Sequence, residues 1–188
     1  MMFIFVTSIS IGFIGCSKAD NNSNSENVVQ SGTDNTISDD ETKDESQIED
    51  EVKIIEKEAD ISACFSLMQE LRPHLKSEDF TQQVLAQFKE GYHLFAMIKE
   101  SQIVTLCGCR ISANLAWGKH LYIDDLISSG SGRSLGYGKE MMAYLISFAK
   151  EKGCEKMHLD SGVQRFQAHK FYLREGFKIA SHHFSQEL

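Results

Sequence analysis

The stretch LYIDDLISSGSGRSLGYGKEMMAYLISFAKEKG, residues 121–153, decides the fold of this chain. It is typical of a strand over residues 121–127, a turn rich in glycine and serine over 128–138, and then a helix. A helix is expected because methionine, leucine and phenylalanine recur at intervals of three and four, which gives it one apolar face. Gly153 is expected to end this helix, since a left-handed residue commonly follows the last turn.

The turn between this strand and this helix has the composition of an anion site. Its small residues let the backbone approach a ligand closely, and the first N–H groups of the following helix have no partner inside the helix. Arg133 adds a positive charge and the turn contains no acid. The turn is therefore predicted to bind a diphosphate group.

Spacing excludes two common diphosphate motifs. A P-loop needs Ser or Thr after its lysine, but Lys139 is followed by Glu140, and this argues against a nucleotide hydrolase. A dinucleotide fingerprint needs a third glycine where Leu135 or Met141 stands. What remains is R-x-x-G-x-G over residues 133–138. This pattern resembles the acetyl-CoA pyrophosphate loop of the GNAT acyltransferase superfamily.

A second GNAT-like pattern is A-x-x-x-Y-x-x-x-G-F over residues 168–177. The resemblance implies that Tyr172 protonates the departing CoA thiolate, and four-residue spacing puts Ala168 on the same helical face. The alternative is that Tyr172 is a core aromatic residue. Two positions depart from the family pattern, namely Arg165 in place of asparagine and Ser128 in place of valine, and both leave the substrate class open.

The resemblance implies acetyl-CoA as cosubstrate and an amine as acceptor. The pantetheine arm is expected to lie along the end of the strand, and the pyrophosphate on the turn. The residues expected to bind the coenzyme are Leu126, Ile127, Ser128, Arg133, Ser134, Leu135, Gly136, Tyr137, Gly138 and Lys139.

Acetyl transfer to an amine also needs a proton acceptor, since most amines are protonated at neutral pH. Asp124 and Asp125 lie in the strand before the turn and are expected to point to opposite faces of the sheet. Each is a stronger candidate than Asp160 on the next strand. Two alternatives stay open: one aspartate pairs with a nearby Arg or Lys, or water alone carries the proton away.

The order of expected elements gives the fold class, an α/β fold with a mixed, mostly antiparallel sheet and helices on both faces, as in GNAT proteins. The expected strands are 52–58, 92–99, 102–111, 121–127, 156–161 and 177–184, and the expected helices are 60–72, 78–89, the helix that Gly153 ends, and 164–175. A two-residue hairpin is expected at Glu100-Ser101.

Composition divides the chain into three parts. Residues 1–16 are apolar, resemble a signal segment, and end at Cys16 like a lipoprotein cleavage box, although a mis-assigned start is an equal alternative. Residues 17–51 hold 11 of the 27 acids and 2 of the 19 bases, and are expected to be a disordered tether. Residues 52–188 keep 16 acids and 17 bases and are expected to form the catalytic domain.

This near-neutral domain lacks the basic stripe of a nucleic-acid-binding protein. Its histidines and cysteines show no zinc spacing, so no metal is expected. The partners implied are a small-molecule or peptide amine and, as a further option, a second copy in a homodimer. A cytoplasmic location is expected. The alternative is a lipid-anchored module, attached only through Cys16, that senses CoA or binds other proteins without catalysis.

Overall fold

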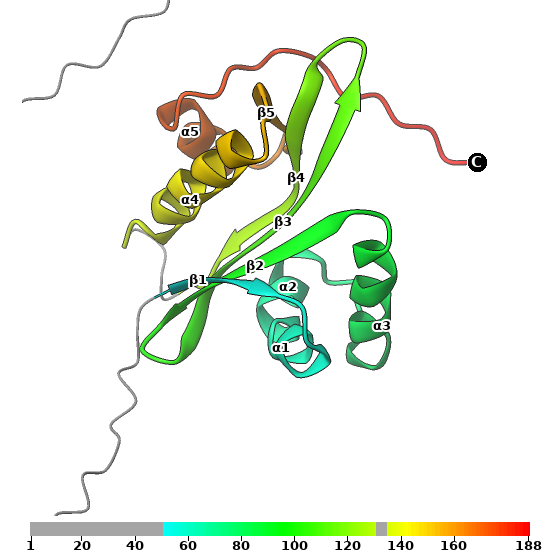
Figure 1. The fold of residues 1–188 in the computed structure, drawn as a ribbon, viewed down its shortest axis with the longest axis vertical. Helices are drawn as coiled ribbons and strands as arrows, with labels where there is room; N and C mark the ends of the chain where they lie inside the picture. Colours follow the sequence, from blue (N-terminus) through cyan, green and yellow to red (C-terminus); the bar gives the residue numbers. More distant parts are fainter. Residues whose placement is uncertain (1–50, 131–134) are drawn as a thin grey trace, which may run out of the picture. The chain divides into compact units, whose positions relative to one another are not determined.

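The computed structural model describes residues 51–130 and 135–188, all within one unit of the chain, Glu45–Leu188. The expectations for residues 1–16 and 17–50, and for Cys16, Arg133 and Ser134, lie outside the described residues. The elements follow in the order β1 (Glu51–Ile55), α1 (Glu58–Ala63), α2 (Phe65–Leu71), α3 (Ser77–Phe88), β2 (Tyr92–Lys99), β3 (Gln102–Asn114), β4 (Gly118–Ser128), α4 (Tyr137–Glu151), β5 (Lys156–Leu159) and α5 (Phe166–Arg174) (Figure 1).

The five strands form one sheet in the order β1-β2-β3-β4-β5. Neighbouring strands are antiparallel except β4 and β5, which are parallel. The hairpin between β2 and β3 has two residues, and both Glu100 and Ser101 have positive φ, as the tightest hairpin turns require. The expected mixed, mostly antiparallel sheet is therefore confirmed.

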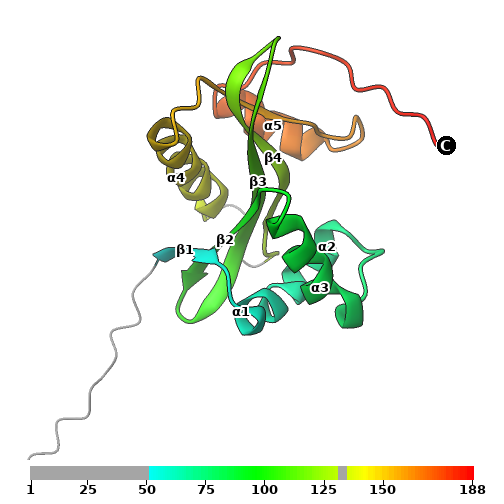
Figure 2. The same ribbon diagram turned by 45° about the vertical axis from the view of Figure 1, so that its right-hand side comes forward.

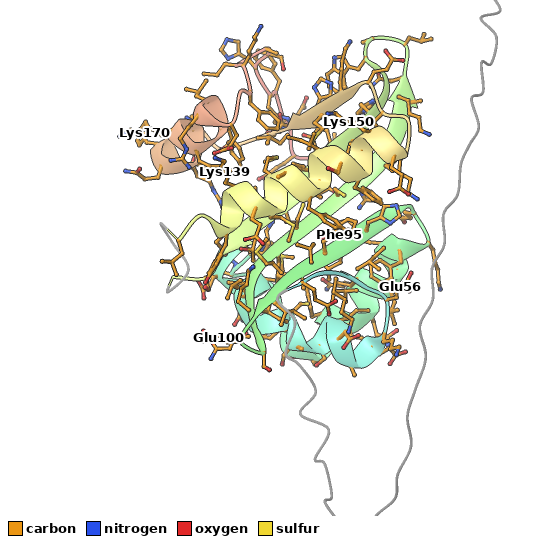
Figure 3. The ribbon with its side chains drawn as sticks, turned by 60° about the vertical axis from the view of Figure 1, so that its left-hand side comes forward. Glu56, Phe95, Glu100, Lys139, Lys150 and Lys170 are labelled. Carbon is orange, nitrogen blue, oxygen red and sulfur yellow. The ribbon has the colours of Figure 1, made fainter. Side chains whose placement is uncertain are left out.

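Helices cover both faces of this sheet (Figure 2). Helices α1 to α3 lie on one face, where Ile61, Leu67 and Phe80 pack against Leu94 of β2. Helix α4 lies on the other face and buries the 3–4-spaced residues expected from the sequence, which are Met141, Met142, Leu145 and Ala149. Phe95 of β2 is fully buried beneath it (Figure 3). Strand β2 therefore contributes successive residues to two separate cores.

The two ends of α4 are set by glycines. Gly136 precedes the helix with φ of 90°, and Gly153 follows it with φ of 71°. Left-handed backbone is strained for residues with a Cβ, so glycine is favoured at both positions. The expected end of the helix at Gly153 is confirmed.

The expected helix over residues 60–72 is interrupted at Cys64, which separates α1 from α2. The Cys64 amide donates to the Ile61 carbonyl at 3.0 Å, one residue short of α-helical spacing. The Cys64 thiol instead donates to the Asp60 carbonyl at 3.2 Å. Asp60 does not cap the helix, which begins at Glu58, and its carboxylate pairs with Lys53 at 3.1 Å.

The expected final strand over residues 177–184 is wrong, because this segment has no regular secondary structure. Its apolar side chains are not covered, since Ile179 is 78% exposed and Phe184 is 89% exposed. Strand β5 ends at Leu159 and is only four residues long, so its outer edge offers few backbone partners to a further strand. Within the described ranges, no helix combines the length and apolar composition that a bilayer crossing requires.

Candidate active site

Strand β4 contains an irregularity at the two candidate aspartates. Gly108 of β3 pairs with Asp125, but the next residue, Cys109, pairs with Ile123, so Asp124 is an extra residue in β4. Such a bulge breaks the alternation of side chains between the two faces. The expectation that Asp124 and Asp125 point to opposite faces is therefore wrong, because both side chains bind groups on the side of α2 and α3.

Two arginines bind these aspartates. Arg72, which follows α2, donates from Nε to Asp125 Oδ1 at 2.8 Å and from Nη2 to the Asp124 carbonyl at 2.9 Å. Arg110 of β3 donates from Nε to Asp124 Oδ2 at 2.9 Å. Tyr92 adds a hydrogen bond from its hydroxyl to Asp125 Oδ2 at 2.9 Å. The ion pair considered as an alternative in the sequence is thus present for both aspartates.

Burial raises the pKa of Asp124, while the neighbouring Arg110 opposes that rise. Burial also raises the pKa of Tyr92, so this hydroxyl remains a donor to Asp125. The two aspartates border different cavities. Asp124 lines a cavity of about 250 Å³ beside α5, whereas Asp125 lines one of about 320 Å³ between α2, α3 and the sheet. Of the two, only Asp124 borders the cavity that also contains Tyr172.

The smaller cavity lies where β4 and β5 part. Their pairing ends at Ile123 and Leu159, and beyond this point β4 pairs only with β3 among the described strands. The outer backbone edge of β4 from Asp124 to Ser128 is therefore open. The cavity wall comes from the end of α2, from β4, from the segment after β5 and from α5, and includes Leu71, Arg72, Ile123, Asp124, Leu126, Leu159, Asp160, Ser161, Gly162, Gln164, Arg165, Ala168 and Tyr172.

Tyr172 and Ala168 both line this cavity, as their shared helical face predicts. The Tyr172 ring packs edge-to-face on Phe171, with centroids 5.4 Å apart, and lies 5.9 Å from Phe177. Burial raises the pKa of Tyr172, and Arg165 partly offsets that rise. Its phenol therefore keeps its proton at neutral pH, as a proton donor must.

The start of α4 lies against the end of β4. A Cβ added to Gly138 would lie 3.4 Å from the Phe171 ring and 3.6 Å from Ser128 Oγ. The Lys139 amide already donates to the Gly136 carbonyl at 2.9 Å, so this amide has a partner within the helix turn. Among the described residues, the amides of Gly136, Tyr137 and Gly138 have no backbone acceptor. Tyr137 also lies beneath Lys99, whose Nζ is 5.9 Å from the ring centroid.

Asp160, the weaker candidate in the sequence, directly follows β5. It lines the same cavity as Tyr172, its Oδ2 accepts a hydrogen bond from the Tyr122 hydroxyl at 2.6 Å, and His183 Nδ1 lies 2.8 Å from the same oxygen. The neighbouring Ser161 Oγ is buried without a partner in the part of the chain that the structure describes. The pairing of β4 with β5 could have suggested the contact with Tyr122, but nothing in the sequence indicated His183.

No three His, Cys, Asp or Glu side chains gather closely enough to hold a metal ion within residues 51–130 and 135–188. The arrangement instead has an open strand edge and a buried phenol at one cavity, and the N-terminus of α4 lies near Ser128 at the end of that strand. An open strand edge binds an extended chain, and a helix N-terminus binds an anion. The end of β4 thus combines a surface suited to an extended chain with one suited to an anion.

Comparison with known proteins identifies the family. Residues 59–177 match the acetyltransferase (GNAT) family, and the chain belongs to it. An uncharacterized N-acetyltransferase of Bacillus subtilis, YhdJ, is 38% identical over 122 residues, which cover 64% of this chain and 86% of the relative.

Solved structures share the fold at lower identity. An acetyltransferase of Trypanosoma brucei has a TM-score of 0.62 and 24% identity, covering 73% of this chain and 99% of that one. An aminoglycoside N-acetyltransferase in complex with CoA has a TM-score of 0.65 and 13% identity, covering 74% of this chain and 96% of that one. The GNAT fold expected from the sequence is therefore confirmed.

Proposed function

We propose that this acetyltransferase moves an acetyl group from acetyl-CoA to an amine by direct attack. The observation that carries the proposal is the cavity where β4 and β5 part, because Tyr172 and the open edge of β4 border it together. Its volume of about 250 Å³ suits the reacting end of the coenzyme and a small amine rather than a bulky acceptor.

The coenzyme is expected to bind in two parts. The pantetheine arm extends along Leu126, Ile127 and Ser128 and pairs with the open edge of β4 as an added strand. The pyrophosphate lies against the turn before α4, with Leu135, Gly136, Tyr137 and Gly138 supplying backbone N–H groups. Arg133 and Ser134 remain expected ligands from the sequence, and Lys139 contributes its side-chain charge rather than its amide.

The chemistry follows from this placement. The amine nitrogen attacks the thioester carbon, and the carbonyl oxygen gains negative charge that N–H groups of β4 stabilise. As the C–S bond breaks, the Tyr172 hydroxyl gives its proton to the sulfur. An acceptor that enters as an ammonium ion loses two protons: one passes to the solvent before the attack, and the other, lost from nitrogen after the C–N bond forms, restores the Tyr172 hydroxyl. The products are the acetylated amine, CoA thiol and the one proton released to the solvent.

Two measurements on the full chain test this function. Isothermal titration calorimetry with acetyl-CoA is expected to show saturable binding, and a thiol reagent is expected to detect CoA release when an amine acceptor is added. A panel of primary amines, amino acids and peptide N-termini serves as the source of acceptors. The absence of both binding and thiol release across this panel would contradict the proposal.

A further inference from the structure

The reaction needs a group that takes a proton from the acceptor, and the two aspartates of β4 are poorly placed for this. Asp124 and Asp125 each hold an arginine at 2.8–2.9 Å. A guanidinium beside a carboxylate favours its charged form and so weakens it as a base. For Asp124, burial outweighs the effect of its arginine and raises the pKa. Asp124 therefore remains a competing candidate for the base, and the experiment must distinguish it from other carboxylates.

Asp160 has different surroundings. It lines the cavity with Tyr172, and no Lys or Arg forms an ion pair with it in the described part of the chain. Its hydrogen bond from Tyr122 and its contact with His183 Nδ1 both involve the same oxygen, Oδ2. The other oxygen, Oδ1, accepts no hydrogen bond from the described residues, so one lone-pair-bearing atom remains for a ligand.

The proton positions in this group follow from its chemistry. A carboxylate can only accept hydrogen bonds, so the Tyr122 hydroxyl is the donor to Asp160 Oδ2. Burial, and then the hydrogen bond to Asp160, raise the pKa of Tyr122, so its hydroxyl remains a donor. Tyr122 and His183, from different parts of the chain, both contact Oδ2 and restrict the orientation of the carboxylate.

We propose that Asp160 is the general base of the acetyl transfer, and that Tyr122 and His183 are positioning residues that hold it. This inference rests on the proposed function. Asp160 Oδ1 takes one proton from the acceptor ammonium, and the nitrogen lone pair then forms the bond to the thioester carbon. The Asp160 side chain is 49% exposed, so the proton passes from it to water.

Charged groups on every neighbouring element influence this base. Arg72 after α2, Arg165 before α5 and Asp124 on β4 border the same cavity as Asp160. His183 in the C-terminal segment lies against the Asp160 carboxylate, with Nδ1 2.8 Å from Oδ2.

The experiment compares pH profiles of kcat and kcat/KM for the full chain and four variants. Asp160→Asn is expected to lower kcat by about 100-fold or more, the usual contribution of a general base, while acetyl-CoA affinity stays the same. His183→Gln removes an imidazole that can place a positive charge 2.8 Å from Asp160 Oδ2, and a positive charge there favours the charged carboxylate, so the acidic limb of the profile is expected to move to higher pH. Tyr122→Phe removes a donor that favours the charged carboxylate, so the same limb is expected to move to higher pH.

Two controls make the outcome decisive. His182→Gln changes the neighbouring exposed histidine and is expected to leave the profile unchanged. Asp124→Asn tests the competing base: if it abolishes the acidic limb while Asp160→Asn retains it, the inference is overturned. A rise in the acceptor KM of Asp160→Asn without a fall in kcat also overturns it, because Asp160 would then only bind the acceptor.

This test can fail separately from the proposed function. If the unmodified chain releases thiol from acetyl-CoA and Asp160→Asn does so equally fast, the inference alone is wrong. If the unmodified chain neither binds acetyl-CoA nor releases thiol, the proposed function is wrong. Should Asp160→Asn fail to fold, the shifts to higher pH expected for both His183→Gln and Tyr122→Phe still decide the matter, since a shift of either limb to lower pH contradicts the inference.

Discussion

At the scale of single residues, Tyr172 links the sequence pattern to the chemistry. Its place on the cavity wall and its raised pKa agree with a proton donor, but its aromatic contacts with Phe171 and Phe177 would also suit a core residue. The two roles make different demands on the side chain. Packing requires the ring, whereas proton donation requires the hydroxyl.

Tyr172→Phe is therefore expected to fold normally and to lose about 100-fold in kcat, because it keeps the ring and removes the proton. Steady-state thiol release, with calorimetry for acetyl-CoA affinity, measures the effect. Tyr144→Phe is the matched control. Tyr144 belongs to α4 and packs on Phe95, with ring centroids 5.5 Å apart, and it does not line the cavity. Turnover of Tyr172→Phe within a few-fold of the unmodified chain would assign Tyr172 to packing alone.

The sequence pattern predicted the helical face that Tyr172 shares with Ala168, but it did not predict the orientation of the two aspartates in β4. The order of Asp124 and Asp125 indicates alternating faces only if the strand is regular, and the bulge that turns both to one side depends on register with β3. The contacts from Asp160 to Tyr122 and to His183 span 38 and 23 residues. Contacts of this kind follow from tertiary packing, and no local pattern encodes them.

At the scale of elements, β4 is held in its bulged form by what lies beside it. Arg72 binds the carbonyl of the extra residue, Asp124, and Tyr92 reaches across Gly108 to Asp125. A Cβ on Gly108 would collide with the Tyr92 hydroxyl and ring. Glycine is thus required here by close packing rather than by backbone conformation.

Gly108→Ala is expected to lower the free energy of unfolding by about 1–3 kcal/mol, as overpacked interiors commonly do, because Tyr92 must move away from Asp125. Urea denaturation followed by circular dichroism measures this loss. Gly130→Ala is the control, since no atom of the residues that the structure describes lies within 4 Å of the Cβ it adds. Equal stability of the two variants would show that Tyr92 is not confined as described.

Elements with strong local signals were predicted well. The apolar face of α4, its end at Gly153 and the two-residue β2–β3 hairpin all follow from nearby residues. The strand expected over residues 177–184 did not form, because a strand depends on a distant partner and not only on its own residues. Its apolar residues suggested burial, but a strand also needs a neighbour with free backbone groups, and β5 is too short to supply many.

At the scale of the molecule, we expect the pH dependence of folding stability to involve His158, which does not line the cavity with Tyr172. His158 stacks on Trp117 with ring centroids 4.0 Å apart, and its Nε2 is buried without a partner in the described ranges. Burial lowers the pKa of His158 below its usual 6.5, and the neighbouring His120 and Lys156 lower it further. The folded state therefore favours the neutral ring.

The sign of the pH effect follows from this shift. Between the lowered pKa in the folded state and about 6.5 in the unfolded chain, the unfolded state binds more protons, so stability falls as the pH falls through this range. His158→Phe keeps an aromatic ring over Trp117 and is expected to reduce that fall in melting temperature between pH 7 and pH 5. The exposed His182→Gln should leave the fall unchanged, and an identical slope for both variants would contradict the assignment.

The parting of β4 from β5 has a consequence beyond catalysis. Peptide groups from Asp124 to Ser128 are left without a neighbouring strand in the described structure, and such rows readily recruit other extended chains. A bound coenzyme arm would occupy the same groups and shield them. We therefore expect the protein to self-associate more readily without bound acetyl-CoA, its proposed acetyl donor, than when it is saturated with acetyl-CoA.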